Sequence, residues 1–148
     1  MGPSAFRLLK DTFTVLLNCA DTQILDTLFI HMDKILQSFW SEENLKNQMF
    51  LEGVMTKILE IRKPFDDIPT VKWRQHERIL QSFKVFPLIL DSESVYEQCV
   101  PVLFKILLES YPITLKRLSC EILVLYMRRL KRSEYQEVIL RQLLGRKD

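Results

Sequence analysis

Apolar residues recur every three or four positions along most of this 148-residue chain, which is the spacing of one face of an α-helix. The clearest segment runs from Asp21 to Trp40, where polar residues separate the members of a wide apolar stripe. Such a stripe predicts an amphipathic helix that buries one face. Asp21 or Thr22 can cap its start, because either side chain accepts a hydrogen bond from an N–H of the first turn.

The same periodicity predicts six further helices joined by short links. We expect them over residues 5–18, 41–61, 70–86, 94–109, 112–130 and 133–144. Ser94–Glu97 and Ser133–Gln136 have the form of capping boxes, which mark helix starts, and Gly145 suits a helix end. In chain order, Pro87 should end or kink the fourth helix, and Pro101 should bend the fifth.

The stretch Arg62–Pro69 interrupts the helical pattern and is the longest irregular link that we expect. Two prolines bracket its acidic tip, which contains Asp66 and Asp67. Adjacent carboxylates rarely converge on one substrate, so we interpret them as a solvated loop tip rather than an acid–base pair. His76, on the following helix between polar neighbours, is interpreted as a surface or rim histidine.

Taken in order, the predicted helices pair into hairpins of similar length. The second helix of each pair starts near Thr22, Val71 and Ile113, about 49 and 42 residues apart, close to the roughly 40–47-residue period of HEAT and armadillo repeats. We therefore predict an all-α fold, a right-handed α-α superhelix of about seven helices forming one HEAT-like domain over residues 1–148. Its repeats should cover residues 4–40, 41–87 and 93–131, followed by a helix at 133–144.

The composition argues against catalysis and against a bound cofactor or metal. Three scattered glycines cannot supply the clustered N–H groups of a phosphate loop. Cys19, Cys99 and Cys120 form no Cys-x-x-Cys pair, and neither histidine lies at zinc-ligand spacing, so we expect free, buried thiols in a reducing compartment. With no signal peptide and no membrane-spanning apolar run, we expect a soluble cytoplasmic protein.

Charge is distributed unevenly along the chain, although the net charge is only +2. Residues 1–110 carry 12 Lys or Arg and 15 Asp or Glu, whereas residues 111–148 carry 9 and 4. A basic ridge could hold nucleic-acid phosphates, which gives an alternative function, but no aromatic platform accompanies it and nucleic acid is the less favoured partner. The basic residues concerned are Arg128, Arg129, Lys131 and Arg132, with Lys116 and Arg117.

Four segments carry a resemblance to known HEAT-repeat proteins. Val100–Glu109 looks like the first helix of a HEAT repeat, bent by its proline, and Pro112–Leu123 looks like the second. Lys72–Phe83 resembles the Trp-Arg helix of the scaffold subunit of protein phosphatase 2A and, more closely, the same region of regulatory subunit 4 of protein phosphatase 4. Leu16–Leu28 is similar to a repeat boundary of that regulatory subunit.

The resemblance implies a non-catalytic scaffold whose partner is the catalytic subunit of a Ser/Thr phosphatase, of the protein phosphatase 4 type. In the related scaffold family partners bind the turns within repeats, which here would lie near residues 18–21, 62–67 and 110–111. Trp73 is also explained by packing between repeats, and a purely structural solenoid segment is a third hypothesis. The candidate partner-binding residues are Asp21, Phe65, Asp66, Asp67, Trp73, Arg74, Tyr111, Lys116 and Arg117.

Overall fold

The computed structural model describes residues 3–40 and 45–145, and the regular structure in these two ranges is helical, without strands. The all-α prediction is therefore confirmed for the described residues. The expected start of the third helix at Ser41 lies outside them. The elements are α1 (Pro3–Leu17), α2 (Thr22–Ile30), α3 (Met32–Trp40), α4 (Leu45–Arg62), η1 (Lys63–Asp67), α5 (Trp73–Gln81), η2 (Ser82–Lys84), α6 (Phe86–Ile89), α7 (Ser92–Leu108), α8 (Ile113–Arg129) and α9 (Ser133–Leu144).

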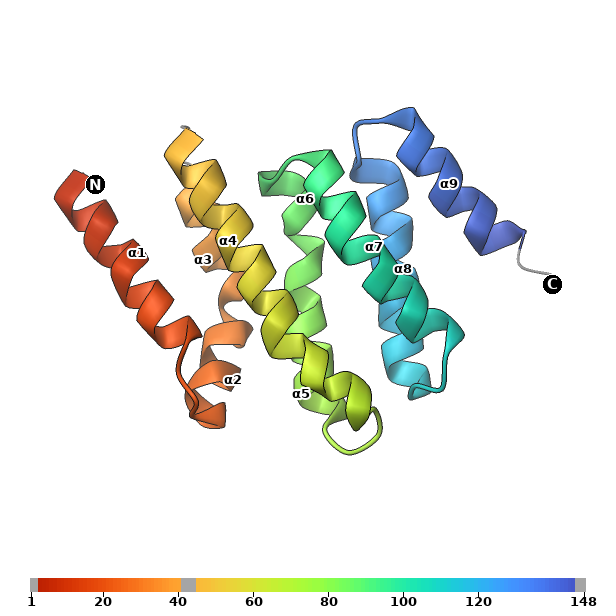
Figure 1. Cartoon of the computed structure of the whole chain (residues 1–148), viewed down its shortest axis with the longest axis horizontal. Helices are drawn as coiled ribbons and strands as arrows, with labels where there is room; N and C mark the ends of the chain where they lie inside the picture. Colours follow the sequence, from red (N-terminus) through yellow and green to blue (C-terminus); the bar gives the residue numbers. More distant parts are fainter. Residues whose placement is uncertain (1–2, 41–44, 146–148) are drawn as a thin grey trace.

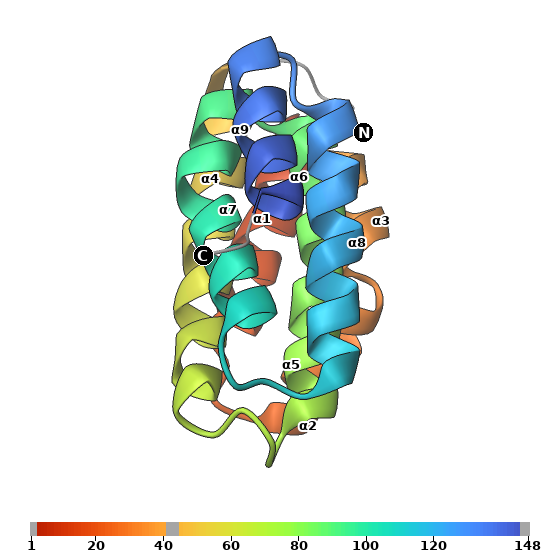
Figure 2. The same ribbon diagram turned by 90° about the vertical axis from the view of Figure 1, so that its right-hand side faces the viewer.

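The helices stand side by side in a row, with α1 at one end and α9 at the other (Figure 1). Seen along the row, α4 and α7 lie in one layer, and α5, α6 and α8 lie in the other (Figure 2). Successive helix pairs contact each other within both layers, since α4 meets α7 while α2, α5 and α8 meet in turn. The arrangement is a row of antiparallel helix pairs rather than a bundle around one centre.

Two of the expected long helices are divided. His31, with φ −104° and ψ 8°, separates α2 from α3, and a 3₁₀ turn (η2) separates α5 from α6. Because α2 lies against α5 and α3 lies against α6, the two breaks are neighbours in the same layer. Pro87 is the second residue of α6 and is compatible with a first helical turn, so the predicted fourth helix is kinked at this point instead of ending.

Aromatic and aliphatic side chains from all the helix pairs form one continuous core. Phe13 of α1 meets Phe39 of α3 at a ring-centroid distance of 5.6 Å, and Phe39 meets Phe50 of α4 at 5.0 Å. Further along the row, the fully buried Tyr126 of α8 donates to the backbone carbonyl of Phe83 at 2.7 Å. Side chains therefore join each helix pair to the next.

Helix caps confirm some expectations and correct others. Asp21 caps α2, since its Oδ1 accepts from the backbone N–H groups of the second and third residues that follow it. The capping box at Ser94 was wrong: Asp91 caps α7, and the Ser94 hydroxyl donates to Glu52 instead. Ser133 is not a cap either, because α9 begins with it after Arg132. Gly145 does end α9.

Candidate protein-binding edge

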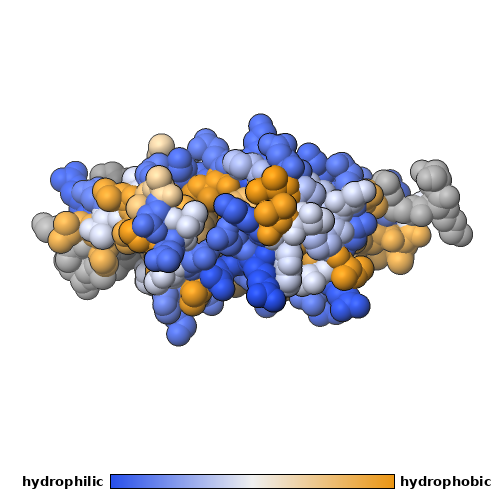
Figure 3. All heavy atoms as spheres, turned by 90° about the horizontal axis from the view of Figure 1, so that it is seen from below, coloured by the Kyte–Doolittle hydropathy of each residue, from blue (hydrophilic) through white to orange (hydrophobic). Residues whose placement is uncertain are grey.

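The turns within the helix pairs lie along one long edge of the row, the lower edge in Figure 1. They are the α1–α2 link (residues 18–21), the α4–α5 link (residues 63–72) and the α7–α8 link (residues 109–112). We call this surface the turn edge. Figure 3 looks onto it and shows apolar residues in separate groups among hydrophilic ones, with one group near the middle.

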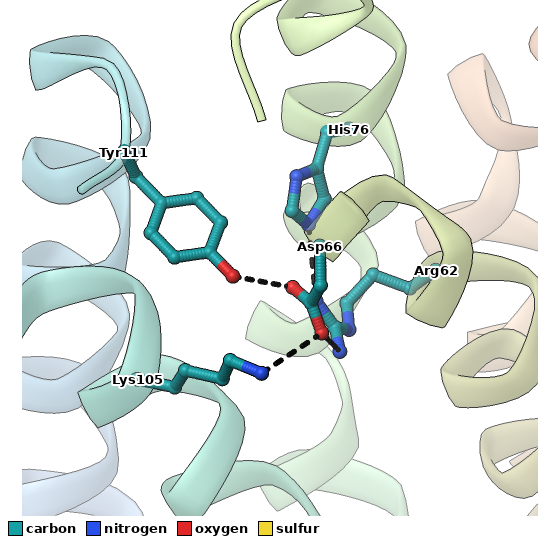
Figure 4. Close-up of polar contacts among 5 residues, drawn as sticks. All are labelled: Arg62, Asp66, His76, Lys105 and Tyr111. Carbon is teal, nitrogen blue, oxygen red and sulfur yellow. Dashed lines mark hydrogen bonds and ion pairs between the residues drawn. The ribbon is translucent and has the colours of Figure 1, made fainter. Parts of the chain in front are cut away.

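A cluster of five polar side chains fixes the middle of the turn edge (Figure 4). The Arg62 guanidinium, only 4% exposed at the end of α4, donates to both carboxylate oxygens of Asp66 at 2.8 and 2.9 Å. Asp66 lies in η1, which continues the helical direction of α4, so these residues meet one turn apart. This bidentate pair is the strongest geometry available to an arginine and a carboxylate.

The same carboxylate reaches the next helix pair. The Tyr111 hydroxyl in the α7–α8 link donates to Asp66 Oδ1 at 2.6 Å, and Lys105 Nζ of α7 lies 3.7 Å from Oδ2. Burial alone would raise the pKa of Asp66, but hydrogen bonds from Arg62 and Tyr111 and the two positive charges lower it to about 2. Asp66 is therefore a permanent anion that joins two turns.

His76 of α5 completes the cluster from below the surface. It is 0% exposed, and its ring stacks on Phe65 with centroids 5.3 Å apart. Its Nε2 lies 3.3 Å from Arg62 Nη1, and because arginine can only donate, Nε2 accepts and the ring proton is on Nδ1. Burial, followed by the charge of Arg62, lowers the pKa of His76 to about 4, so the ring is neutral at pH 7.

Beside the cluster, an apolar groove of about 250 Å³ opens between α2 and α5. Asp26, Lys72 and Gln75 are polar residues on its walls. Ile68 and Val71, two apolar residues of the α4–α5 link, are 38% and 71% exposed. The turn edge thus combines a fixed polar centre with apolar surface that faces solvent. The apolar floor of the groove consists of Leu25, Phe29, Ile61, Phe65 and Ile79.

The structure gathers part of the predicted site and corrects the rest. Phe65, Asp66 and Tyr111 meet in the cluster, but Asp66 is enclosed rather than a solvated tip; Asp67 is exposed. Trp73 is half-buried, with the Arg74 guanidinium 5.2 Å from its ring centroid. Asp21 is an exposed helix cap on the first turn, and Lys116 and Arg117 lie near the start of α8. Within the described residues, no hydrogen bond or ion pair joins Asp21, Lys116 or Arg117 to the cluster.

Three members of the cluster were not among the predicted site residues. His76 is buried, not a surface or rim residue, and Arg62 and Lys105 were not singled out. Arg62 and Asp66 are four residues apart, a spacing that predicts an ion pair if the helix continues past Pro64. No comparable signal links this segment to Tyr111, 45 residues further along the chain.

The three cysteine side chains differ in their burial. Burial raises the pKa of the Cys99 thiol to about 12, which keeps it protonated and unreactive. Cys19 and Cys120 are also free thiols, but they are half-buried rather than buried. No three His, Cys, Asp or Glu side chains in residues 3–40 and 45–145 are grouped as metal ligands would be. In the same ranges, every helix is too short or too polar to cross a membrane.

The predicted basic ridge is divided between two places. Arg128, Arg129 and Arg132 are exposed around the end of α8, whereas Lys116 lies near the start of that helix. At 1.5 Å per residue, the two groups are about 18 Å apart along the helix axis. Arg132 is also engaged by Glu134 and lies 4.9 Å from the ring centroid of Tyr135. The basic residues do not form one continuous surface.

Comparison with known proteins gives a distant relationship. The chain is 23% identical over 144 residues to the serine/threonine-protein phosphatase 4 regulatory subunit 4 of Mus musculus, and 21% identical over 148 residues to that of Homo sapiens. Each match covers 95% of this chain but only 16% of the relative's length. No protein-family model and no solved structure matches the chain.

Proposed function

We propose that this distant relative of a phosphatase regulatory subunit is a non-catalytic protein-binding scaffold. Its partner would be the catalytic subunit of a Ser/Thr phosphatase of the protein phosphatase 4 type. The observation that carries the proposal is the match along 95% of the chain to a subunit named for its regulatory role. The enclosed, fully paired state of Asp66 agrees with a structural rather than a catalytic use of this site.

The architecture supports the proposal because a row of helix pairs leaves long, accessible edges. We propose that residues 4–40, 41–87 and 93–131 are HEAT-type repeats of one domain, followed by the helix at 133–144, in a right-handed superhelix. Each pair covers the apolar stripe of its neighbour, as repeat proteins require. The turns are then free to contact another protein.

The turn edge is the favoured docking surface. The cluster around Asp66 holds the α4–α5 link to the α7–α8 link, so that a partner would meet ordered backbone and little ordering entropy would be lost on binding. Trp73 and Arg74 lie at the start of α5, and Trp and Arg are enriched at interface hot spots. Phe65, Asp67, Asp21, Lys116 and Arg117 are the further contact candidates on this edge.

The test is direct binding between purified proteins. The chain, immobilised on resin, should retain purified protein phosphatase 4 catalytic subunit, and the variant Arg74→Glu should retain clearly less. Arg129→Glu makes the same charge change at the end of α8, away from the turn edge, and should bind like the original. No retention by the original chain contradicts the proposed function.

The exposed basic group at the end of α8 favours a second candidate function, nucleic-acid binding. Arg128, Arg129 and Lys131 are exposed and lie beyond ion-pair distance of any carboxylate in the described part of the chain. Phosphate contacts by these residues would give an affinity that falls steeply with salt. Replacing all three by Glu should abolish retention of a 20-nucleotide single-stranded RNA; unchanged retention excludes this candidate.

A further inference from the structure

We propose that the groove between α2 and α5 receives an apolar side chain of the partner, presented from a segment that is otherwise acidic. This inference deepens the proposed function, because it takes the turn edge as the docking surface and specifies the chemistry of what docks. The groove lies beside the Asp66 cluster and on the same edge, because Phe65, Ile68 and Lys72 of the α4–α5 link line it.

The size and lining of the groove fit a side chain better than a small molecule. Its volume of about 250 Å³ is below the roughly 300–1,000 Å³ of typical small-molecule sites. Its floor is apolar and is contributed by two successive helix pairs, with Leu25 and Phe29 from α2 and Ile61 and Ile79 from α4 and α5. A leucine, methionine or phenylalanine inserted here would lose its contact with water, which is the main source of affinity at such a contact.

One wall of the groove does not need to move when the groove is filled. Phe65 lines it and stacks on the buried ring of His76, which accepts from Arg62. Arg62 is in turn held by Asp66. A preformed wall lowers the ordering cost of binding. The polar cluster thus has a role at the interface without touching the partner itself.

The charges around the mouth of the groove select an acidic segment. Asp26 is the carboxylate on its wall. Arg78 of α5 lies 3.4 Å from this carboxylate, and the negative charge of Asp26 is therefore already balanced. Lys72, on the opposite wall, is exposed and lies beyond ion-pair distance of every carboxylate in residues 3–40 and 45–145. Within residues 63–74, Lys63 and Arg74 are also exposed, whereas Asp67 is the one exposed carboxylate.

Exposed apolar residues extend the contact beyond the groove. Ile68 lines it and is 38% exposed, and Val71, in the same link, is 71% exposed. A partner segment that enters the groove would cover these side chains as well. An apolar anchor followed by glutamates or aspartates therefore matches the whole surface, with the anchor in the groove and the acidic residues facing Lys72.

Two synthetic peptides test the inference by fluorescence anisotropy. The first has 12 residues, with one Leu-Phe pair between Glu-Gly repeats; the second carries Lys in place of each Glu. The original chain should bind the acidic peptide about tenfold more tightly than the basic one, and Lys72→Glu should remove this preference. Lys131→Glu, the same change in the α8–α9 link, should leave it intact. The Gln75→Trp variant should fill the groove and weaken binding of the acidic peptide at least as much as Lys72→Glu does.

Each result decides the inference separately from the proposed function. Equal binding of both peptides, no binding at millimolar concentration, or an unchanged preference in Lys72→Glu overturns it. Circular dichroism shows whether the Gln75→Trp variant is folded. If it is not, the Lys72→Glu variant still tests the inference, because Lys72 is exposed. If the original chain retains the phosphatase catalytic subunit but Lys72→Glu retains it equally well, the groove inference fails while the proposed function stands. If the acidic peptide binds and the catalytic subunit does not, only the proposed function fails.

Discussion

At the scale of single residues, the Asp66 carboxylate has three partners from two helix pairs: Arg62 and Tyr111 donate hydrogen bonds to it, and Lys105 forms an ion pair with it. Replacing it by Asn would remove the negative charge and leave the guanidinium of Arg62 buried and uncompensated. We expect Asp66→Asn to lower the free energy of unfolding by about 2–3 kcal/mol, measured by urea denaturation. Asp67→Asn, at the exposed neighbour, should change it by less than about 0.5 kcal/mol. Equal effects of the two changes would contradict this role of Asp66.

His76 should give the protein a distinctive pH dependence. Its pKa falls from 6.5 to about 4 on folding, so between these values the unfolded chain binds a proton that the folded chain does not. Stability should therefore decrease by about 3 kcal/mol as the pH falls from 7 to 4. Asp66, whose pKa is lowered from 3.8 to about 2, should cause a further loss below pH 4.

The His76→Gln variant separates the two steps. Glutamine keeps an acceptor for Arg62 but does not titrate, so the loss of stability between pH 6.5 and 4 should become shallow while the loss below pH 4 persists. Urea denaturation at several pH values measures both, and a steep loss retained between pH 6.5 and 4 in His76→Gln would show that another group causes it.

The cluster contains some residues that the sequence could predict and others that it could not. Phe65, Asp66 and Tyr111 were selected because they lie in turns, which the apolar periodicity places well. Arg62 and His76 were missed because a charged or polar residue on a helix predicts solvent exposure unless its partner is known. Here the partners lie on other elements, as with Tyr111, 45 residues from Asp66. Only the folded arrangement brings these groups together.

At the scale of elements, the break between α5 and α6 has a polar consequence. The Phe83 carbonyl lies in the 3₁₀ turn η2, at the centre of the core. It accepts a hydrogen bond from the Tyr126 hydroxyl at 2.7 Å. Tyr126→Phe would leave this carbonyl buried without its donor. We expect a loss of about 1–3 kcal/mol in the free energy of unfolding, measured by chemical denaturation. Tyr135→Phe provides the control, because the hydroxyl of this half-buried ring accepts only an exposed bond from Arg132, and it should be nearly neutral; a neutral Tyr126→Phe would show that the bond contributes nothing.

The breaks themselves could not be predicted, although the helices were. The apolar stripe from Asp21 to Trp40 is continuous, and no glycine or proline interrupts it. The division at His31 lies beside the break between α5 and α6, where η2 and Pro87 are located, and contacts between two elements are absent from the pattern of a single segment. The start of α7 differs from the expected one by two residues. The helix begins at Ser92 after its cap Asp91, and the completely buried Val95 lies in its first turn.

At the scale of the whole molecule, the row gives each helix pair only near neighbours. α1 packs mainly on α2, whereas α8 contacts α5, α6, α7 and α9. In such an arrangement, stability depends on local pairs and their interfaces. The order of helices and the position of the turns followed from the apolar pattern, and the row is what the hairpin spacing predicted.

Hydrogen exchange followed by mass spectrometry should reveal this local character. Phe13→Ala removes a ring that packs against Phe39 and Phe50 and should destabilise its surroundings by about 3 kcal/mol. Exchange should accelerate in α1 to α4 and remain nearly unchanged in α8. Ile139→Ala, in α9, should have the reverse effect. Uniform acceleration along the chain by either variant would show that the row unfolds as a single unit.

The Asp66 carboxylate also sets the shortest piece of this protein that could be transplanted into another helical repeat. A graft of residues 62–76 would carry the Arg62 pair and the His76 ring but would leave behind the donors from Lys105 and Tyr111. The recipient protein would then carry a largely buried Asp66 carboxylate that lacks two of its three partner side chains. All partners of Asp66 lie within residues 62–111, so any engineered shuffling of these helix pairs has to keep that stretch whole.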